Sequence, residues 1–276
     1  MNGMLRALAL ALTLGMAGAV EAADDSRERN ALADQTLVLA GAAKQVDYLQ
    51  RMLKERIREA RANLDPEPQE LLDRFGAEAL KGDALQIAVR ARFRESLDRT
   101  QAAEAVNWLR SAVGRKVVGL EAQAMSAESA ATLKAFEGEL EARGPSSERF
   151  VLVNRILEAW NQPDFYLDAG HALLAGLGRG LDKLKAGDSV ARLGEAEPAL
   201  NATLSRSKAA LDQATFIHFL FAYRGAKDTE LDQYARFLTS DSGRWLVRTF
   251  QQSAVSAVEA SGEKAVGEVA KLPKKP

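Results

Sequence analysis

The chain has 276 residues, a net charge of −1 and no cysteine. The near-zero net charge argues against electrostatic binding to nucleic acid or to anionic lipid, and the lack of cysteine excludes disulfides, a thiol nucleophile and a lipid-modified cysteine. A chain of this length can bury enough apolar surface to fold without crosslinks, as one large domain or two ordinary ones.

The N-terminus has the pattern of a secretory signal peptide. Arg6 supplies positive charge, residues 7–20 form a short apolar run, and Val20 and Ala22 are the small residues before a cleavage point ahead of Ala23. The run is shorter than the roughly 20 residues of a membrane-spanning helix. We therefore expect cleavage, export to the periplasm of a Gram-negative envelope, and no integral membrane segment in the mature chain. The alternative is a retained N-terminal anchor.

The rest of the chain predicts helices. It is rich in Ala, Leu, Glu, Arg and Lys, which lose least on entering a helix, and it has no convincing run of alternating apolar residues. Val46, Leu49, Leu53 and Ile57 are spaced by three and four, which places them on one helix face. The predicted fold class is therefore all-α. In the first half we expect helices over residues 26–40, 43–63, 68–81, 83–98, 100–110 and 112–143.

Gly144 and Pro145 form the clearest interior break, and we place a boundary between two helical units there. Gly176, Gly178 and Gly180 form a patch that we expect to end or interrupt a helix. In the second half we expect helices over residues 147–161, 163–175, 197–223, 229–239 and 241–260. The predicted organisation is a signal peptide at 1–22, a first unit at 23–143, a second unit at 144–261 and a flexible tail at 262–276.

An internal repeat is the most specific signal. Residues 100–123 match residues 229–252 without a gap, and a weaker echo pairs Tyr48 and its neighbour Leu49 with Tyr166 and Leu167. The identical positions of the first match are Thr100/Thr229, Leu109/Leu238, Ser111/Ser240, Gly114/Gly243, Arg115/Arg244, Val118/Val247 and Gln123/Gln252. We therefore expect two related multi-helix units, in tandem or packed against each other, as a helical bundle or array.

Each copy of the match reads aromatic-Leu-x-Ser-x-x-Gly-Arg, which predicts a tight corner between two helices. The serine side chain is placed to cap the second helix, and the glycine lets the first helix pack close. Each arginine is expected to pair with a nearby carboxylate. The alternative is that the motif binds a ligand. The candidate binding residues are then Trp108, Ser111, Gly114, Arg115, Phe237, Ser240, Gly243 and Arg244.

Residues 37–49, LVLAGAAKQVDYL, and residues 108–116, WLRSAVGRK, resemble the bacterial "domain of unknown function 2059" family. Members of that family are exported helical proteins whose hallmark is an aromatic pair followed by Ser-Pro-x-Gly after a capped helix. Here Leu109 replaces the second aromatic residue, and Ala112 and Asp241 stand where the family often has proline. The resemblance implies a helical fold and export, and it implies no activity.

No constellation of residues predicts catalysis. The two histidines, His171 and His218, have no partner at metal-ligand spacing, and we expect His218 to be a packed residue. The glycines at 176, 178 and 180 follow a helical stretch, whereas a phosphate-binding loop follows a strand. The arginines at 90, 92, 94 and 99 spread around their helix, which favours a solvated surface. We therefore predict no catalytic residue, no metal and no cofactor.

The expected function is a non-catalytic periplasmic binding or protein-interaction module. Paired amphipathic helices can leave a groove for an envelope protein, a peptide or an apolar ligand. One alternative is a hydrolase with two converging carboxylates in a cleft between the units. Another is a structural envelope protein that associates with itself.

Overall fold

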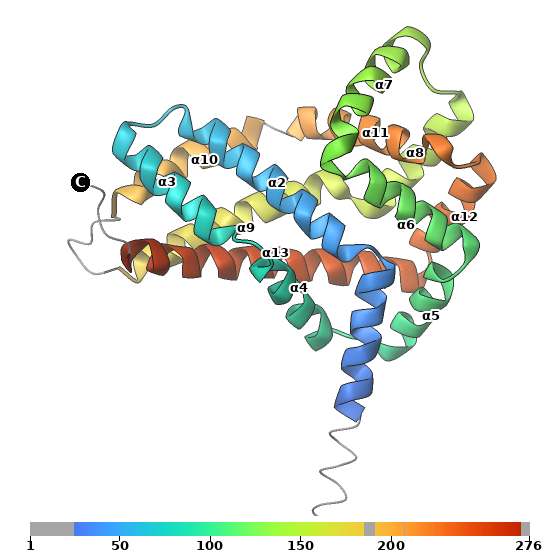
Figure 1. Cartoon of the computed structure of the whole chain (residues 1–276), viewed down its shortest axis with the longest axis horizontal. Helices are drawn as coiled ribbons and strands as arrows, with labels where there is room; N and C mark the ends of the chain where they lie inside the picture. The colour runs from blue at the N-terminus through green and yellow to red at the C-terminus, as the bar shows by residue number, and fades with distance from the viewer. Residues whose placement is uncertain (1–24, 185–190, 207, 272–276) are drawn as a thin grey trace, which may run out of the picture.

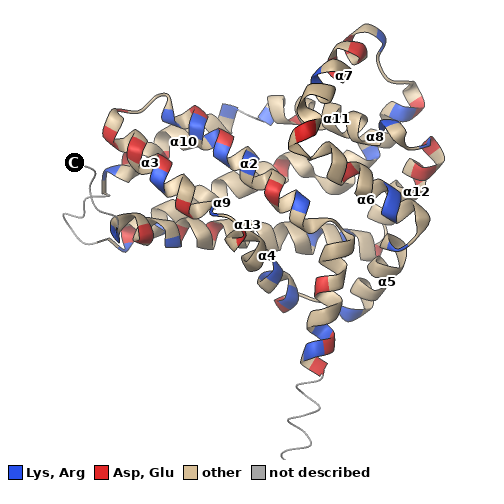
Figure 2. Cartoon of the chain, viewed as in Figure 1, with Lys and Arg blue, Asp and Glu red and all other residues tan. Residues whose placement is uncertain are grey.

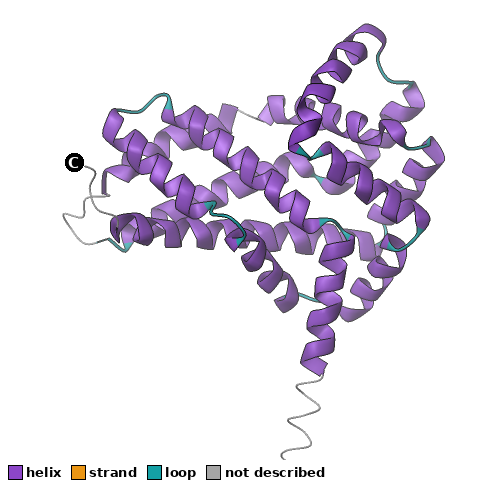
Figure 3. Cartoon of the chain, viewed as in Figure 1, coloured by secondary structure: helices purple, strands orange, loops and turns teal. Residues whose placement is uncertain are grey.

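The computed structural model describes residues 25–184, 191–206 and 208–271, and over these residues every regular element is a helix (Figure 3). The predicted signal peptide lies outside the described residues. A first helix covers residues 25–39. The helices that follow in the first half are α2 (Ala42–Arg61), α3 (Pro66–Ala79), α4 (Ala84–Glu95), α5 (Arg99–Leu109), α6 (Ala112–Ala124), the 3-10 turn η1 (Ala127–Ser129) and α7 (Ala130–Arg143).

The second half begins after Gly144, a residue with a positive φ of 64° that ends α7. Its elements are α8 (Ser147–Trp160), α9 (Gln162–Asp182), η2 (Ala191–Glu195), α10 (Ala196–Arg206), α11 (Lys208–Ala222), η3 (Tyr223–Gly225), α12 (Asp228–Leu238) and α13 (Asp241–Lys271). The all-α prediction is confirmed. One long predicted helix is divided, because residues 112–143 form α6, η1 and α7. The predicted helix over residues 197–223 corresponds to α10 and α11, which lie on either side of residue 207, outside the described residues.

The predicted helix break at the glycine patch is wrong, because α9 runs through it to Asp182. A Cβ atom at Gly176 would lie 2.3 Å from the carbonyl oxygen of Glu259, and one at Gly180 would lie 2.5 Å from a methyl carbon of Val266. Both neighbours belong to α13, which lies side by side with α9 (Figure 1). These two glycines therefore allow a close helix–helix contact instead of ending a helix.

The predicted flexible tail is also wrong over residues 262–271, where α13 continues to Lys271. Gly262 lies against α9, with its Cβ position 3.0 Å from the carbonyl oxygen of Leu173. Ala265, Val266 and Val269 are buried beyond it. Apolar burial against neighbouring helices thus stabilises α13 beyond residue 260, where the helical spacing of apolar residues in the sequence becomes weaker. Residues 272–276 lie outside the described residues.

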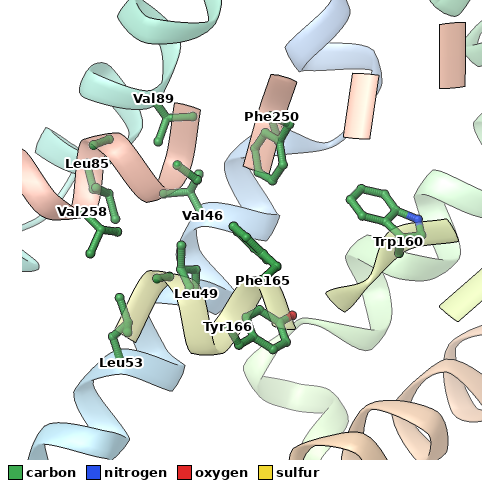
Figure 4. Packing of buried hydrophobic residues seen from close by; sticks show 14 of the residues in the cluster. Val46, Leu49, Leu53, Leu85, Val89, Trp160, Phe165, Tyr166, Phe250 and Val258 are labelled. Carbon is green, nitrogen blue, oxygen red and sulfur yellow. The ribbon is translucent and has the colours of Figure 1, made fainter. Parts of the chain in front are cut away.

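The predicted boundary at residue 144 does not separate two cores. The buried apolar residues form one cluster that draws on both sides of it. Figure 4 shows Leu49 of α2 and Val89 of α4 in the same cluster as Phe165 of α9 and Val258 of α13. The long helix α13 packs against α3, α4 and α5 of the first half as well as against α9. The two halves therefore share a single hydrophobic core.

Candidate functional site

The two corners have the predicted caps. Ser111 Oγ accepts a hydrogen bond from the Gly114 amide at 3.0 Å, and Ser240 Oγ accepts one from the Gly243 amide at 3.1 Å. Each serine thereby satisfies a backbone donor that the first turn of its helix leaves free. The capping role that the sequence predicts for both serines is confirmed.

Both corner glycines lie against the preceding helix. A Cβ atom at Gly114 would stand 2.4 Å from the carbonyl oxygen of Trp108, and one at Gly243 would stand 1.9 Å from that of Phe237. Both distances are far below van der Waals contact, and the opposing atoms belong to the backbone. No side chain larger than hydrogen fits either position without a shift of the corner itself.

The corner arginines also act locally. Arg115 donates to the carbonyl of Arg110, and Arg244 donates to the carbonyl of Thr239, five residues back in each case. Arg244 also pairs with Asp241 Oδ1 at 2.6 Å, as expected, whereas Arg115 is held by the carbonyl. The hydrogen bonds and the ion pair of these serines and arginines lie within the motif, and ligand binding at the corners stays a prediction.

The structure brings the two corner aromatics together. Trp108 and Phe237 stack with ring centroids 4.0 Å apart and ring planes within 4° of parallel. Trp108 also stacks on Tyr234, with centroids 5.5 Å apart. The two corners therefore meet face to face, although 129 residues separate Trp108 from Phe237 in the sequence.

Beside this stack lies a buried carboxyl group that the sequence analysis missed. Glu121 Oε1 accepts hydrogen bonds from Tyr223 at 2.6 Å and from Tyr234 at 2.7 Å, and Trp160 Nε1 donates to the Tyr234 hydroxyl at 2.8 Å. Burial raises the pKa of Glu121, and the two tyrosine hydrogen bonds act against this rise. The spacing from Val117 to Glu121 already placed this carboxyl on the buried face of α6, but its partners are about 100 residues away.

A cavity of about 10 Å³ adjoins Glu121, which is room for one water molecule. Its polar lining comes from both halves: Gln45 and Glu121 from the first, Gln162 and His218 from the second. The Oε1 atom of Gln162 is buried there without a hydrogen-bond partner. The cavity is too small for an organic substrate. Among the described residues Glu121 is the one buried acidic side chain, and it is the carboxyl group that lines this cavity.

His218 gives a testable pH dependence. Burial lowers its pKa to about 4 from an ordinary value of 6.5, since the charged ring loses its hydration. Between these values the unfolded chain binds a proton that the folded chain does not, so stability present above pH 6.5 is lost as the pH falls toward 4. We expect His218→Gln to reduce the decrease in the free energy of unfolding between pH 7 and pH 4 by up to about 3 kcal/mol. Urea unfolding at the two pH values measures this decrease, which we call the acid loss.

The matched control is His171→Gln, because His171 is the other histidine of the chain and is exposed. This control should leave the acid loss unchanged. An equal acid loss in the wild type and in His218→Gln would contradict the assignment.

An open groove lies between the helix of residues 25–39, the start of α2, and α4. It has a volume of about 320 Å³ and a lining that is mostly apolar, with Leu37, Val46 and Val89 among its buried walls. Val38 and Ile87 also line it and are 76% and 67% exposed, which makes them the most exposed large apolar side chains of the described residues. Apolar side chains of this size on a surface are typical of a binding face when they line one concave site.

Ion pairs border the groove and connect two of its helices. Arg90 and Arg94 both bind Asp34, with Nε–Oδ1 distances of 2.6 and 2.8 Å, and this ties α4 to the helix of residues 25–39. Two members of the arginine run therefore form a structural ion-pair cluster. Elsewhere, basic and acidic residues are interspersed along the helices in Figure 2. No described α-helix carries basic residues alone, which is the pattern expected of a polyanion-binding helix.

The part of the chain that the structure describes contains no cluster of three His, Asp or Glu side chains placed to hold a metal ion. In the same residues no helix is both long enough and apolar enough to cross a bilayer. Comparison with protein-family models, with curated proteins and with solved structures finds no match to this chain.

Proposed function

We propose that this chain is an exported, non-catalytic protein-interaction module whose groove binds an apolar helical segment of a partner in the bacterial envelope. The observation that carries the proposal is the open apolar groove, with Val38 and Ile87 exposed over buried walls. The signal-peptide pattern of residues 1–22 and the resemblance to an exported helical family support the compartment.

The groove suits a helix because two helices and the start of a third form its walls. An amphipathic helix laid between them buries its apolar stripe, and each Å² of apolar surface removed from water contributes roughly 25 cal/mol. The Asp34–Arg90–Arg94 cluster holds the two walls at a fixed separation, so little ordering is needed at the moment of binding. Binding of this kind needs none of the paired acids or metals that a hydrolase needs.

We also propose that the two halves are related helical units. The sequence match of residues 100–123 with residues 229–252 supports this, and so do the corner contacts that recur in both halves. This relation concerns the architecture, and the groove proposal stands without it.

The groove is tested by Ile87→Asp, with Val151→Asp as the matched control. Val151 is 55% exposed on α8 and does not line the groove. We expect the fluorescence of anilinonaphthalene sulfonate bound to the protein to fall strongly in Ile87→Asp and to stay unchanged in Val151→Asp. The reason is that a charge in the groove removes its affinity for apolar groups, whereas a charge at position 151 does not.

A photoactivatable residue introduced at position 87 of the chain expressed in its own host should then crosslink to a discrete partner, and the same residue at position 151 should not. Equal dye binding by both variants would overturn the proposal. So would adducts that are the same from the two positions. An adduct made only of two copies of this chain would replace the proposed function with self-association.

A further inference from the structure

One backbone clamp occurs in both halves. Arg29 donates to the carbonyl of the last residue of α4 and to one in the connection between α4 and α5, and Arg149 donates to two carbonyls in the connection between α11 and α12. The acceptors are Glu95 and Leu97 at 3.0 and 3.5 Å in the first half, and Tyr223 and Ala226 at 3.2 and 2.8 Å in the second. Each clamp joins the first helix of its half to the connection that leads into its corner.

The order of helices around these clamps is the same. In each half the clamp arginine lies on a helix that ends at a left-handed residue, Gly41 with φ 68° or Asn161 with φ 44°. The long helix α2 or α9 follows at once. The corner pair, α5 and α6 or α12 and α13, comes last. The left-handed residue and the corner therefore take the same places in both halves, and α7 links the two series.

The packing between the halves is reciprocal. Helix α6 of the first half packs on α11 and α12 of the second half. Helix α13, the counterpart of α6, packs on α4 and α5, the counterparts of α11 and α12. In an interface built on a two-fold axis, each contact between elements occurs a second time with the two partners exchanged. The contacts of α6 and α13 with the helices that precede the opposite corner follow this rule, whereas the contacts of α10 with α2 and of α13 with α3 have no counterpart of similar extent.

Matched residues also contact each other. Trp108 stacks on Phe237, its match at the corner, and Tyr48 lies against Tyr166, its match in the weaker echo, with ring centroids 5.9 Å apart. A residue can contact its own counterpart only where both lie near the axis that relates them. Two such pairs, one from the match of residues 100–123 with 229–252 and one from the weaker echo, define a line through the molecule.

We propose that a pseudo-two-fold axis passes through these two aromatic pairs, and that the face of the first half around Tyr48 and Trp108 is an interaction surface whose partner is a second unit of the same fold. The second half of the chain supplies that partner covalently, so the molecule is a fused pair. The inference rests on the proposed relation between the halves and not on the groove. Glu121 marks a departure from symmetry, because the matched position of α13 holds Phe250.

The test exchanges residues across the axis in the full chain. Trp108→Phe leaves a gap and Phe237→Trp overfills a buried site, so each single variant should lower the urea midpoint of unfolding. If the two positions have equivalent surroundings, the urea midpoint of the double variant should fall by less than half of the summed decreases of the two single variants. A double variant that shows only the sum of the two losses overturns the inference.

The matched control is a second tryptophan–phenylalanine contact, between Phe93 and Trp245, whose ring centroids are 5.6 Å apart. Positions 93 and 245 are not equivalent under the proposed axis. The exchange Phe93→Trp with Trp245→Phe should therefore show no recovery beyond the sum of its single variants. Equal recovery in both exchanges would mean that contact volume alone explains the result, and it would overturn the symmetry. Because none of these residues lines the groove, the outcome is independent of the proposed binding function.

Discussion

Replacement of Gly243 with alanine is expected to lower the free energy of unfolding by at least about 3 kcal/mol. The added methyl group would stand 1.9 Å from the carbonyl oxygen of Phe237 and 2.8 Å from the Cα atom of Leu238. Both atoms belong to the backbone of α12, which is held by the core on one side and by the Ser240 cap on the other. The corner must therefore open, which separates α12 from α13. Urea unfolding followed by circular dichroism measures the loss.

The control for this substitution lies on the same helix. Gly267 has no atom within 4 Å of its Cβ position, so Gly267→Ala should stabilise α13 by about 0.5–1 kcal/mol through the better helix propensity of alanine. The two alanine variants thus have opposite signs. Similar effects at positions 243 and 267 would show that the corner contact does not limit the residue at 243.

Replacement of Glu121 with leucine is expected to cost about 3 kcal/mol, whereas Glu121→Gln should cost far less. Leucine removes the acceptor for the hydroxyls of Tyr223 and Tyr234, and a buried hydroxyl without a partner costs about 1–3 kcal/mol. Glutamine keeps an acceptor oxygen of the same reach. Calorimetric or urea unfolding of the two variants at one pH measures the difference. Equal losses in both variants would contradict the hydrogen-bonding role.

The pH dependence of these variants has a definite sign. The pKa of Glu121 is raised in the folded protein because of burial, so this group contributes stability at low pH that is lost as the pH rises through the raised value. Glu121→Gln removes that titration, and its stability relative to the wild type should therefore increase with pH.

The surface control for Glu121→Leu is Glu141→Leu on α7. Glu141 is exposed, so this substitution should change the free energy of unfolding by no more than about 0.5 kcal/mol.

Local features of the fold follow from short stretches of sequence. The stripe from Val46 to Ile57 is buried as expected, and Ser111 and Ser240 cap their helices as expected. Helix period, capping and the close fit of a glycine after a cap depend on residues within a few positions of each other. This is why the all-α class and the two corners could be predicted from one sequence.

Other features depend on what lies opposite in space. Gly176 predicts a helix break when it is read alone, but Glu259 of α13 lies against it, so it allows close helix packing. The spacing of Glu121 from Val117 indicates a buried helix face, but only the tertiary structure brings its hydrogen-bond donors Tyr223 and Tyr234 to it. The groove is defined by Val38 and Ile87, which are ordinary apolar positions in their own helices. Gly176 and Glu121 have their roles because of residues that are distant in the sequence, and Val38 and Ile87 have theirs because they are exposed.

The amino-acid sequence by itself determined the helical class, the positions of most helices, both capped corners and the match between the halves, because short-range backbone and side-chain physics encodes each of them. The tertiary structure alone decided that the halves share one core, that the matched aromatics stack on each other, that a carboxyl is buried between the halves and that one apolar groove stays open. Those features depend on contacts between residues that are far apart in the sequence. A local sequence pattern does not predict the free energy of such contacts.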